Sequence, residues 1–296
     1  MPADNSHPHR NTLFVEDADI LAHDSYPGDQ YVLRVRAPRC AARARPGSFA
    51  HLQCSPTLPM RRPLSIMRAS AQDGWIEFLY KDVGTGTHAL AGRVPGESIN
   101  LIGPIGMPFM PDRSRPRALL LGGGVGIPPM VFLADVLRTD KHWQPLVLMG
   151  SEVPFPFSPR PSRFLLPGMP ADVIAAMPLL EDWQVASRLA SLQGYPGCFN
   201  GYITELTRRW LDALSAAERD EVSVYACGPH PMLAETARLA HAYGLPCQVS
   251  LEEYMACAVG GCAGCTVAVN TPSGPAMKRV CVDGPVFDAQ AVCWDQ

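Results

Sequence analysis

The sequence has no apolar run long enough to cross a membrane. The longest run, ALLLGGGVGIPPMVFLA at 118–134, contains four glycines and two prolines. It is shorter than the roughly 20 residues that a spanning helix needs. The opening residues, MPADNSHPHRN, also carry no apolar stretch typical of a secretory signal. We therefore expect a cytoplasmic protein with no membrane span and with a disordered tail at residues 1–11.

A large excess of charge of one sign is also absent. The chain has 25 basic and 28 acidic residues, so its formal net charge is only -3. This balance gives no electrostatic reason to expect nucleic acid or an anionic membrane as a partner. The eight histidines are scattered and form no metal-binding pair. A histidine-based metal site is therefore not expected.

Cysteine, by contrast, is concentrated near the end of the chain. Cys257, Cys262 and Cys265 follow a C-x4-C-x2-C pattern, and Cys281 lies downstream. This is the spacing of plant-type [2Fe–2S] proteins. Alanine and glycine surround the thiols, and small residues let backbone N–H groups approach the sulfurs of a cluster. A zinc site and unliganded structural cysteines remain alternatives, although zinc usually takes paired short Cys-x2-4-Cys hooks.

The chain divides into three regions with different patterns. Short alternating strands separated by turns, such as YVLRVRA and GWIEFLYKDV, dominate residues 12–113 and predict an antiparallel β-barrel. Buried strands such as RALLL and QPLVLMG alternate with helical stretches over 114–247, which predicts an α/β domain with a parallel sheet. Residues 248–296 form a small Cys/Gly-rich segment.

Glycines fill the turn that follows the first buried strand of the α/β region. In LLLGGGVGIPPM, bare backbone and the free N–H groups of a helix start favour a phosphate group. The spacing is not G-x-G-x-x-G, and a connection without a ligand is the alternative. YACGPHPML, at 225–233, ends another strand. Because ligands bind beyond the carboxyl ends of parallel strands, Cys227 should face the same crevice, although a small buried apolar role is the alternative.

Two stretches of the barrel region could hold a phosphorylated cofactor. Arg62 in RRPLSI offers a guanidinium fork, and Ser65 offers a hydroxyl group. Gly84, Gly86 and Thr87 in YKDVGTGTHAL could wrap a pyrophosphate. Each piece alone is equally compatible with a barrel turn and a solvated arginine, but their order along the chain favours a joint site.

The nucleotide-binding and cluster-binding patterns together require an intermediate carrier. A nicotinamide cofactor gives up two electrons as a hydride, whereas a [2Fe–2S] cluster accepts one electron at a time. A flavin accepts the hydride and releases single electrons. The chain then has a barrel for FAD, an α/β domain for NAD(H) and a terminal segment for the cluster.

With these motifs, the chain resembles the ferredoxin-NADP reductase-like flavoproteins, and within them the electron-transfer subunits of two-subunit dihydroorotate dehydrogenases. The stretches GPIG at 103–106 and DGPVFDA at 283–289 add to the resemblance. It implies FAD contacts at Arg62, Pro63, Leu64, Ser65, Gly84, Gly86 and Thr87. It implies NAD(H) contacts at Gly122, Gly123, Gly124, Gly126, Gly228 and Pro229, with Cys227 near the hydride-transfer position. It implies cluster ligands Cys257, Cys262, Cys265 and Cys281.

The resemblance also implies a catalytic flavoprotein partner, of the dihydroorotate dehydrogenase type, in a hetero-oligomer. Related chains serve sulfite reductases, hydrogenases and ferredoxin:NADP oxidoreductases, and the motifs do not choose among these partners. A rival of another class is a zinc-stapled binding protein on a degenerate reductase scaffold.

Two features depart from the family pattern. Ala258 stands directly after the first cluster cysteine, where the family often has glycine. The proline-rich stretch 151–170 lies where the adenosine end of the nucleotide should rest, so it could be a lid, a docking surface or a sign of a changed site. Glu152 mildly favours NAD over NADP, because a carboxylate repels a 2′-phosphate, although a solvated glutamate is the alternative.

Overall fold

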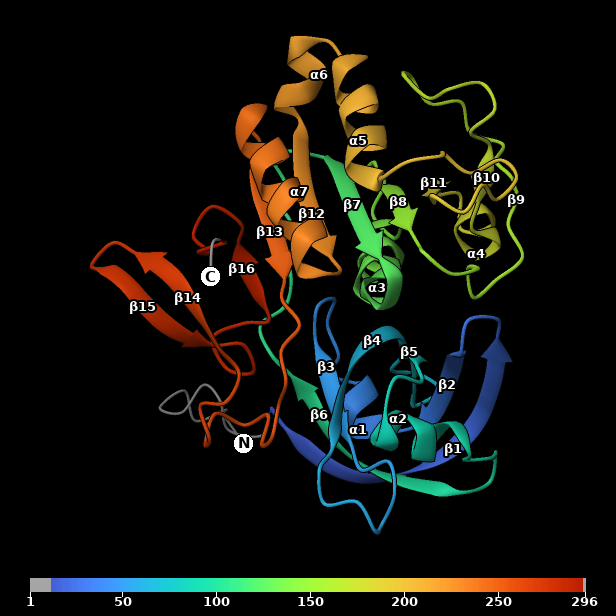
Figure 1. The fold of residues 1–296 in the computed structure, drawn as a ribbon, viewed down its shortest axis with the longest axis vertical. Coiled ribbons are helices and arrows are strands. Elements are labelled where there is room, and N and C mark those ends of the chain that lie inside the picture. Colours follow the sequence, from blue (N-terminus) through green and yellow to red (C-terminus); the bar gives the residue numbers. More distant parts are fainter. Residues whose placement is uncertain (1–11, 295–296) are drawn as a thin grey trace.

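The computed structural model describes residues 12–294. A strand-rich barrel forms one half of the molecule, an α/β unit forms the other half, and a C-terminal hairpin stands to one side (Figure 1). Within residues 12–294, no helix is both long enough and apolar enough to span a membrane. The tail predicted at 1–11 lies outside the described residues.

The barrel is closed by six antiparallel strands in the order β1–β2–β5–β4–β3–β6, as the sequence predicted. Buried and more exposed residues alternate along β6, the pattern of a strand with one face on a core. The interior contains large apolar side chains such as Leu33, Phe78 and Leu101. The elements of this half are β1 (Phe14–Tyr26), β2 (Gln30–Arg36), α1 (Pro38–Ala41), β3 (Phe49–Leu52), β4 (Arg62–Ser70), β5 (Trp75–Lys81), α2 (Thr85–Ala91) and β6 (Ser98–Ile105).

The α/β unit is built on a six-stranded sheet in the order β11–β8–β7–β12–β13–β16. All neighbours pair in parallel except β16, which is antiparallel to β13. Every residue of β7 after Arg117 is buried, as expected for a parallel strand that is covered on both faces. The strands are β7 (Arg117–Gly123), β8 (Leu146–Gly150), β11 (Ala186–Ala190), β12 (Val222–Cys227), β13 (Cys247–Ser250) and β16 (Val286–Asp288).

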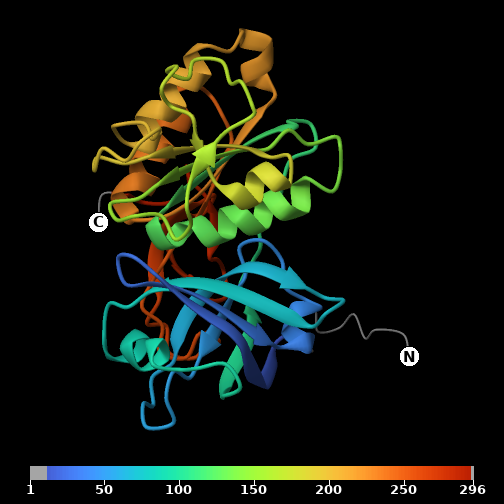
Figure 2. The ribbon, with the colours of Figure 1, turned by 90° about the vertical axis from the view of Figure 1, so that its right-hand side faces the viewer.

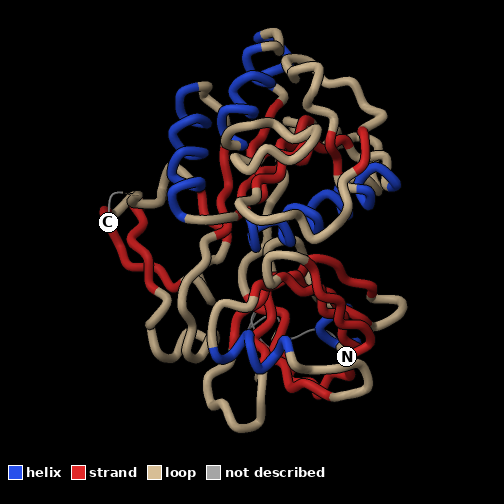
Figure 3. Tube along the Cα trace, turned by 45° about the vertical axis from the view of Figure 1, so that its right-hand side comes forward, coloured by secondary structure: helices blue, strands red, loops and turns tan. Residues whose placement is uncertain are grey.

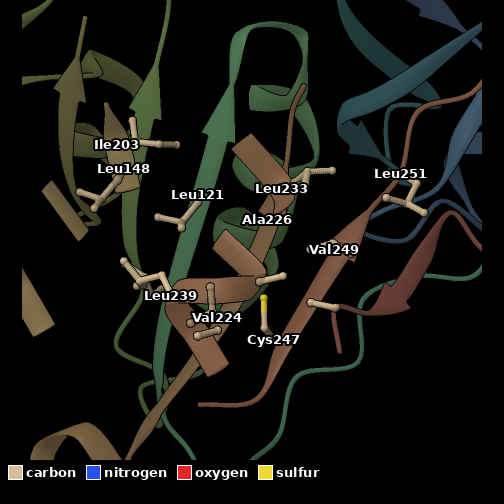
Figure 4. Packing of buried hydrophobic residues seen from close by; sticks show 14 of the residues in the cluster. Leu121, Leu148, Ile203, Val224, Ala226, Leu233, Leu239, Cys247, Val249 and Leu251 are labelled. Carbon is tan, nitrogen blue, oxygen red and sulfur yellow. The ribbon is translucent and has the colours of Figure 1, made fainter. Parts of the chain in front are cut away.

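Helices cover both faces of this sheet. The turn η1 (Gly124–Gly126) leads into α3 (Ile127–Leu137), which lies between the sheet and the barrel (Figure 2). The opposite face packs on α5 (Ile203–Asp212) and α7 (His230–Ala242). Figure 4 shows Leu121, Leu148 and Val224 of the sheet meeting Ile203 and Leu233 of these helices. Two short helices, α4 (Pro178–Asp182) and α6 (Ala216–Asp220), complete the unit.

Loops run over much of the α/β half (Figure 3). The proline-rich stretch is one irregular segment of this kind, and it touches the turn between β1 and β2 of the barrel. Its regular structure is limited to β9 (Arg160–Pro161), which pairs with β10 (Ala175–Ala176). The buried amide of Gln30 donates a 2.7 Å hydrogen bond to the carbonyl of Pro154 and so ties the loop to β2. A cavity of about 460 Å³ beside this contact is lined by side chains that include Tyr26, Phe155 and Tyr195.

The C-terminal segment does not fold apart from the sheet. After β13 the chain passes beside the barrel, forms the cysteine loop, and continues into the hairpin of β14 (Thr266–Thr271) and β15 (Gly274–Arg279) (Figure 1). It then returns as β16 to the edge of the α/β sheet. The limits 12–113, 114–247 and 248–296 therefore stay predictions, since the sheet contains strands from both sides of the last limit.

Candidate functional site

The cysteine loop directs backbone N–H groups at its own sulfurs. The amide of Cys262 donates to Sγ of Cys257 at 3.4 Å, and the amide of Gly264 donates to Sγ of Cys262 at 3.4 Å. From the hairpin, the guanidinium of Arg279 donates to the carbonyl of Gly260 at 2.9 Å and holds the loop in place. The loop thus has the donor pattern that the small residues around the thiols predicted.

The four thiols lie as two contacting pairs, Cys257 with Cys262 and Cys265 with Cys281. Burial raises the pKa of Cys257, but hydrogen bonds from the amides of the loop and from the side chain of Cys262 outweigh it and lower this pKa to about 7. Burial and the thiol of Cys265 raise the pKa of Cys281 to about 12. Within residues 12–294, no three His, Cys, Asp or Glu side chains converge closely enough to hold a metal ion.

The chemical types of these residues nevertheless fit an iron–sulfur cluster. Four cysteines are the complete ligand set of a [2Fe–2S] cluster, and amides directed at sulfur stabilise its negative charge. Ala258 adopts a left-handed conformation with φ of 56° and is buried. A Cβ atom is unfavourable in this conformation, so glycine would fit the position with less strain than alanine.

The glycine turn and the end of β12 lie side by side. Cys227 pairs with Gly122 across the sheet, and Gly126 packs on the backbone of Cys227 and Gly228. Gly124 has φ of +54° and a Cβ there would meet no described atom within 4 Å. Both stretches predicted to bind the nucleotide therefore lie at one edge of the sheet. Gly124 presents bare backbone to open space, as close approach by a ligand requires, whereas Gly122, Gly123 and Gly126 are buried against neighbouring residues.

We expect Gly126→Ala to destabilise the protein and to weaken NAD(H) binding. A Cβ at Gly126 would lie 2.3 Å from the carbonyl oxygen of Cys227, so one of the two backbones must shift. Such overpacking costs about 1–3 kcal/mol. Thermal unfolding and NADH titration measure the effect. Gly92→Ala is the matched control, because its Cβ would meet only Ala89 O at 3.8 Å. Equal melting temperatures for the two variants would contradict the prediction.

Cys227 has a partner that sequence reasoning missed. Its thiol is fully buried and lies 3.9 Å from Oε1 of Glu252. Burial and the carboxyl group of Glu252 raise the pKa of Cys227, and desolvation raises the pKa of Glu252. A cavity of about 380 Å³ opens between Gly228 and this carboxyl group. The available signal was the position of Glu252 two residues after the end of β13, at the same sheet edge as Cys227.

Arg62 brings together the two stretches that were predicted to bind FAD. It begins β4, and its guanidinium lies so close to α2 that a Cβ at Gly86 would be 2.5 Å from Nε. The same guanidinium donates to the carbonyl oxygens of Met60 at 3.0 Å and Arg61 at 3.1 Å. A Cβ at Gly84 would meet no described atom within 4 Å, so this backbone faces open space next to Arg62. These features fit a phosphate-bearing cofactor.

The remaining residues predicted for FAD lie around this centre. Pro63, Leu64 and Ser65 are half-buried on β4, and Ser65 pairs with Phe49 of β3. The hydroxyl of Thr87 accepts hydrogen bonds from the amides of Val83 at 2.9 Å and Gly84 at 3.1 Å. Thr87 therefore closes its own turn, and its predicted contact with a pyrophosphate stays a prediction.

Comparison with known proteins agrees with this geometry. The family model for the iron-sulfur cluster binding domain of dihydroorotate dehydrogenase B matches residues 252–293. The protein from Desulforamulus reducens named dihydroorotate dehydrogenase B (NAD(+)), electron transfer subunit, is 32% identical over 288 residues, which are 95% of this chain and 99% of that protein. The chain belongs to this family. The protein of the same name from Geobacillus kaustophilus is 33% identical over 255 residues, or 84% of this chain and 86% of that protein.

Solved structures show the same fold in more distant proteins. The NADH-dependent reduced ferredoxin-NADP oxidoreductase structure matches with a TM-score of 0.76 at 23% identity, covering 95% of this chain and 91% of that chain. The ferredoxin reductase in carbazole 1,9a-dioxygenase matches with a TM-score of 0.61 at 21% identity, covering 79% of this chain and 67% of that chain. The predicted barrel, α/β and cluster-segment architecture of ferredoxin reductases is therefore confirmed.

Proposed function

We propose that this protein is an electron-transfer subunit that passes electrons between NAD(H), FAD and a [2Fe–2S] cluster, to or from a dihydroorotate dehydrogenase partner. The proposal rests on one observation: a chain of this family combines three candidate sites, one for the nucleotide, one for the flavin and one for the cluster. Bare glycine backbone lies at the sheet edge, Arg62 lies against Gly86 on the barrel, and four cysteines lie on the adjoining segment.

Each site contributes through its own residues. The turn from Gly122 to Gly126 would let the nucleotide approach the start of α3. Cys227 and Glu252 would line the nucleotide site beside this turn. Arg62 would neutralise the pyrophosphate of FAD, while Ser65 would orient its ring. When bound, FAD supplies the conversion of a two-electron hydride into single electrons. The cysteine loop would hold the cluster beside the barrel, because the backbone of Met255, two residues before Cys257, lies against His51 of β3.

The identity of the nucleotide and the partner follow from the family. Curated relatives are named electron transfer subunits of an NAD(+) enzyme, dihydroorotate dehydrogenase B. We therefore assign NAD(H), a place in pyrimidine biosynthesis and a hetero-oligomer with a catalytic flavoprotein subunit.

Glu152 is exposed just after β8, where a carboxylate would disfavour NADP. All ten cysteines are free thiols, which suits the reducing cytoplasm.

Absorption and EPR spectra of anaerobically purified protein test the proposal. We expect bound FAD, iron with acid-labile sulfide, and a cluster signal that develops after NADH is added. Co-expression with a dihydroorotate dehydrogenase catalytic subunit should give a complex that couples dihydroorotate oxidation to NAD(+) reduction. A colourless protein that contains zinc and neither flavin nor iron would instead support the zinc-stapled alternative and reject the proposal.

A further inference from the structure

His51 lies where β3 and β4, the strands proposed to bind FAD, meet the segment that leads into the cysteine loop. We call this segment, residues 251–262, the cluster segment, and we call its contact with β3 the seam. Along β3, Ala50 and Leu52 point into the barrel core, so His51 and Phe49 point to the other face. Phe49 packs in the same hydrophobic cluster as Met255, which lies two residues before Cys257. The imidazole is fully buried there, with an exposed fraction of 0%.

The strand pairing connects His51 to the residues proposed for FAD. His51 pairs with Pro63 of β4, and Phe49 pairs with Ser65. Directly paired residues share one face of a sheet, so His51 and Ser65 lie on the same face of the barrel. The guanidinium of Arg61 donates to the carbonyl of His51 at 3.2 Å, which fixes the two strands together at this point.

The ring lies between the backbones of Arg61 and Met255. Burial, and then the charge of Arg61, lower the pKa of His51 to about 4, so the ring is neutral near pH 7. The backbones of Arg61 and Met255 both favour the protonated ring. Neither ring nitrogen, however, has a partner at hydrogen-bond distance and angle among residues 12–294. The ring therefore touches both backbones through contacts that are longer or more bent than a regular hydrogen bond.

We propose that His51 is a positioning residue that sets the spacing between the flavin-binding strand and the cluster segment, and thereby the rate of electron transfer between FAD and the cluster. The inference rests on the proposed function. One backbone that contacts the ring leads directly to Arg62, and the other leads to Cys257. A rigid, planar ring between them fixes their separation better than a flexible side chain of similar size.

The test compares His51→Leu, His51→Asn and the wild-type protein, with His23→Leu as the matched control. His23 is another barrel histidine, and its ring contacts Arg93 and Tyr80 away from this seam. Iron and FAD contents are measured first. Rapid mixing with NADH then resolves flavin reduction from cluster reduction, and hydrogen exchange of the peptide 251–262 is followed without NADH.

In His51→Leu we expect normal iron and FAD contents, normal flavin reduction, cluster reduction slowed about tenfold or more, and faster hydrogen exchange of 251–262. A misplacement of about 1 Å can cost about a hundredfold in a bond-forming step, and electron transfer falls less steeply with distance, so we expect a slowing closer to tenfold. His51→Asn keeps an N–H group that can contact one of the two backbones, and it should recover part of the rate. His23→Leu should match the wild-type protein.

Four outcomes overturn the inference. Cluster reduction at the wild-type rate in both His51 variants would show that the ring does not set the spacing. Loss of iron or FAD from both variants would show that His51 serves cofactor retention instead. If His51→Leu does not fold, an unchanged rate in His51→Asn is sufficient to reject the inference. A wild-type protein whose cofactors stay oxidised with NADH rejects the proposed function itself and the inference with it.

Discussion

Cys265→Ser is expected to remove the iron centre while leaving the flavin in place. The iron content should fall by about tenfold or more, because even loss of groups that only support a ligand typically costs 10- to 100-fold in metal affinity. Cys265 is buried and contacts Cys281, so solvent cannot easily supply a replacement ligand. Iron analysis and the EPR signal of the reduced protein measure the loss, and flavin absorbance should persist because the residues proposed to hold FAD lie on β4 and α2 and not on the segment that carries the thiols.

Cys293→Ser provides the control for this experiment. Cys293 is half-buried on the same C-terminal segment and has no assigned role, so its replacement should leave iron content and the EPR signal unchanged. An unchanged iron content and signal in Cys265→Ser would contradict the assignment of the four cysteines. A parallel loss of folding, detected by thermal unfolding, would be separated from ligand loss by the retained flavin.

Arg62→Ala is expected to release FAD. A hydrogen bond to a charged group contributes about 1.5–3 kcal/mol, so FAD affinity should fall by roughly tenfold to a hundredfold or more. Because Arg62 also packs on Gly86, its removal would loosen the contact between β4 and α2. The measurement is a titration of apoprotein with FAD, followed by flavin fluorescence, together with flavin content after gel filtration.

Arg39→Ala is the matched control for Arg62→Ala. Arg39 is an exposed arginine of the same barrel that stacks on Phe14, with Cζ 4.3 Å from the ring centroid. Its removal should leave FAD affinity unchanged. If the two variants bind FAD equally well, Arg62 is not a pyrophosphate ligand, and the flavin site must lie elsewhere on the barrel.

Most of the architecture could be predicted because its strands carry strong local patterns. The continuous apolar run of β7 and the alternation in β2 each determine a strand type without reference to distant residues. The strand β1 (Phe14–Tyr26) carries weaker evidence, since only Ala18 and Ile20 are buried among many polar side chains. The return of β16 to the α/β sheet could not be read locally, because its three residues gain stability only from pairing with β13.

The sequence by itself determined which chemical groups are available. These groups are the four spaced thiols, the glycines after β7 and the arginine at the start of β4. Each is a local pattern whose chemistry does not depend on distant residues. Only the tertiary structure decided which groups meet. Glu252 reaches Cys227, Arg62 meets Gly86, and His51 is enclosed between the barrel and the cluster segment. The physical reason is that burial and contact between distant segments arise from packing, which spacing along the chain does not encode.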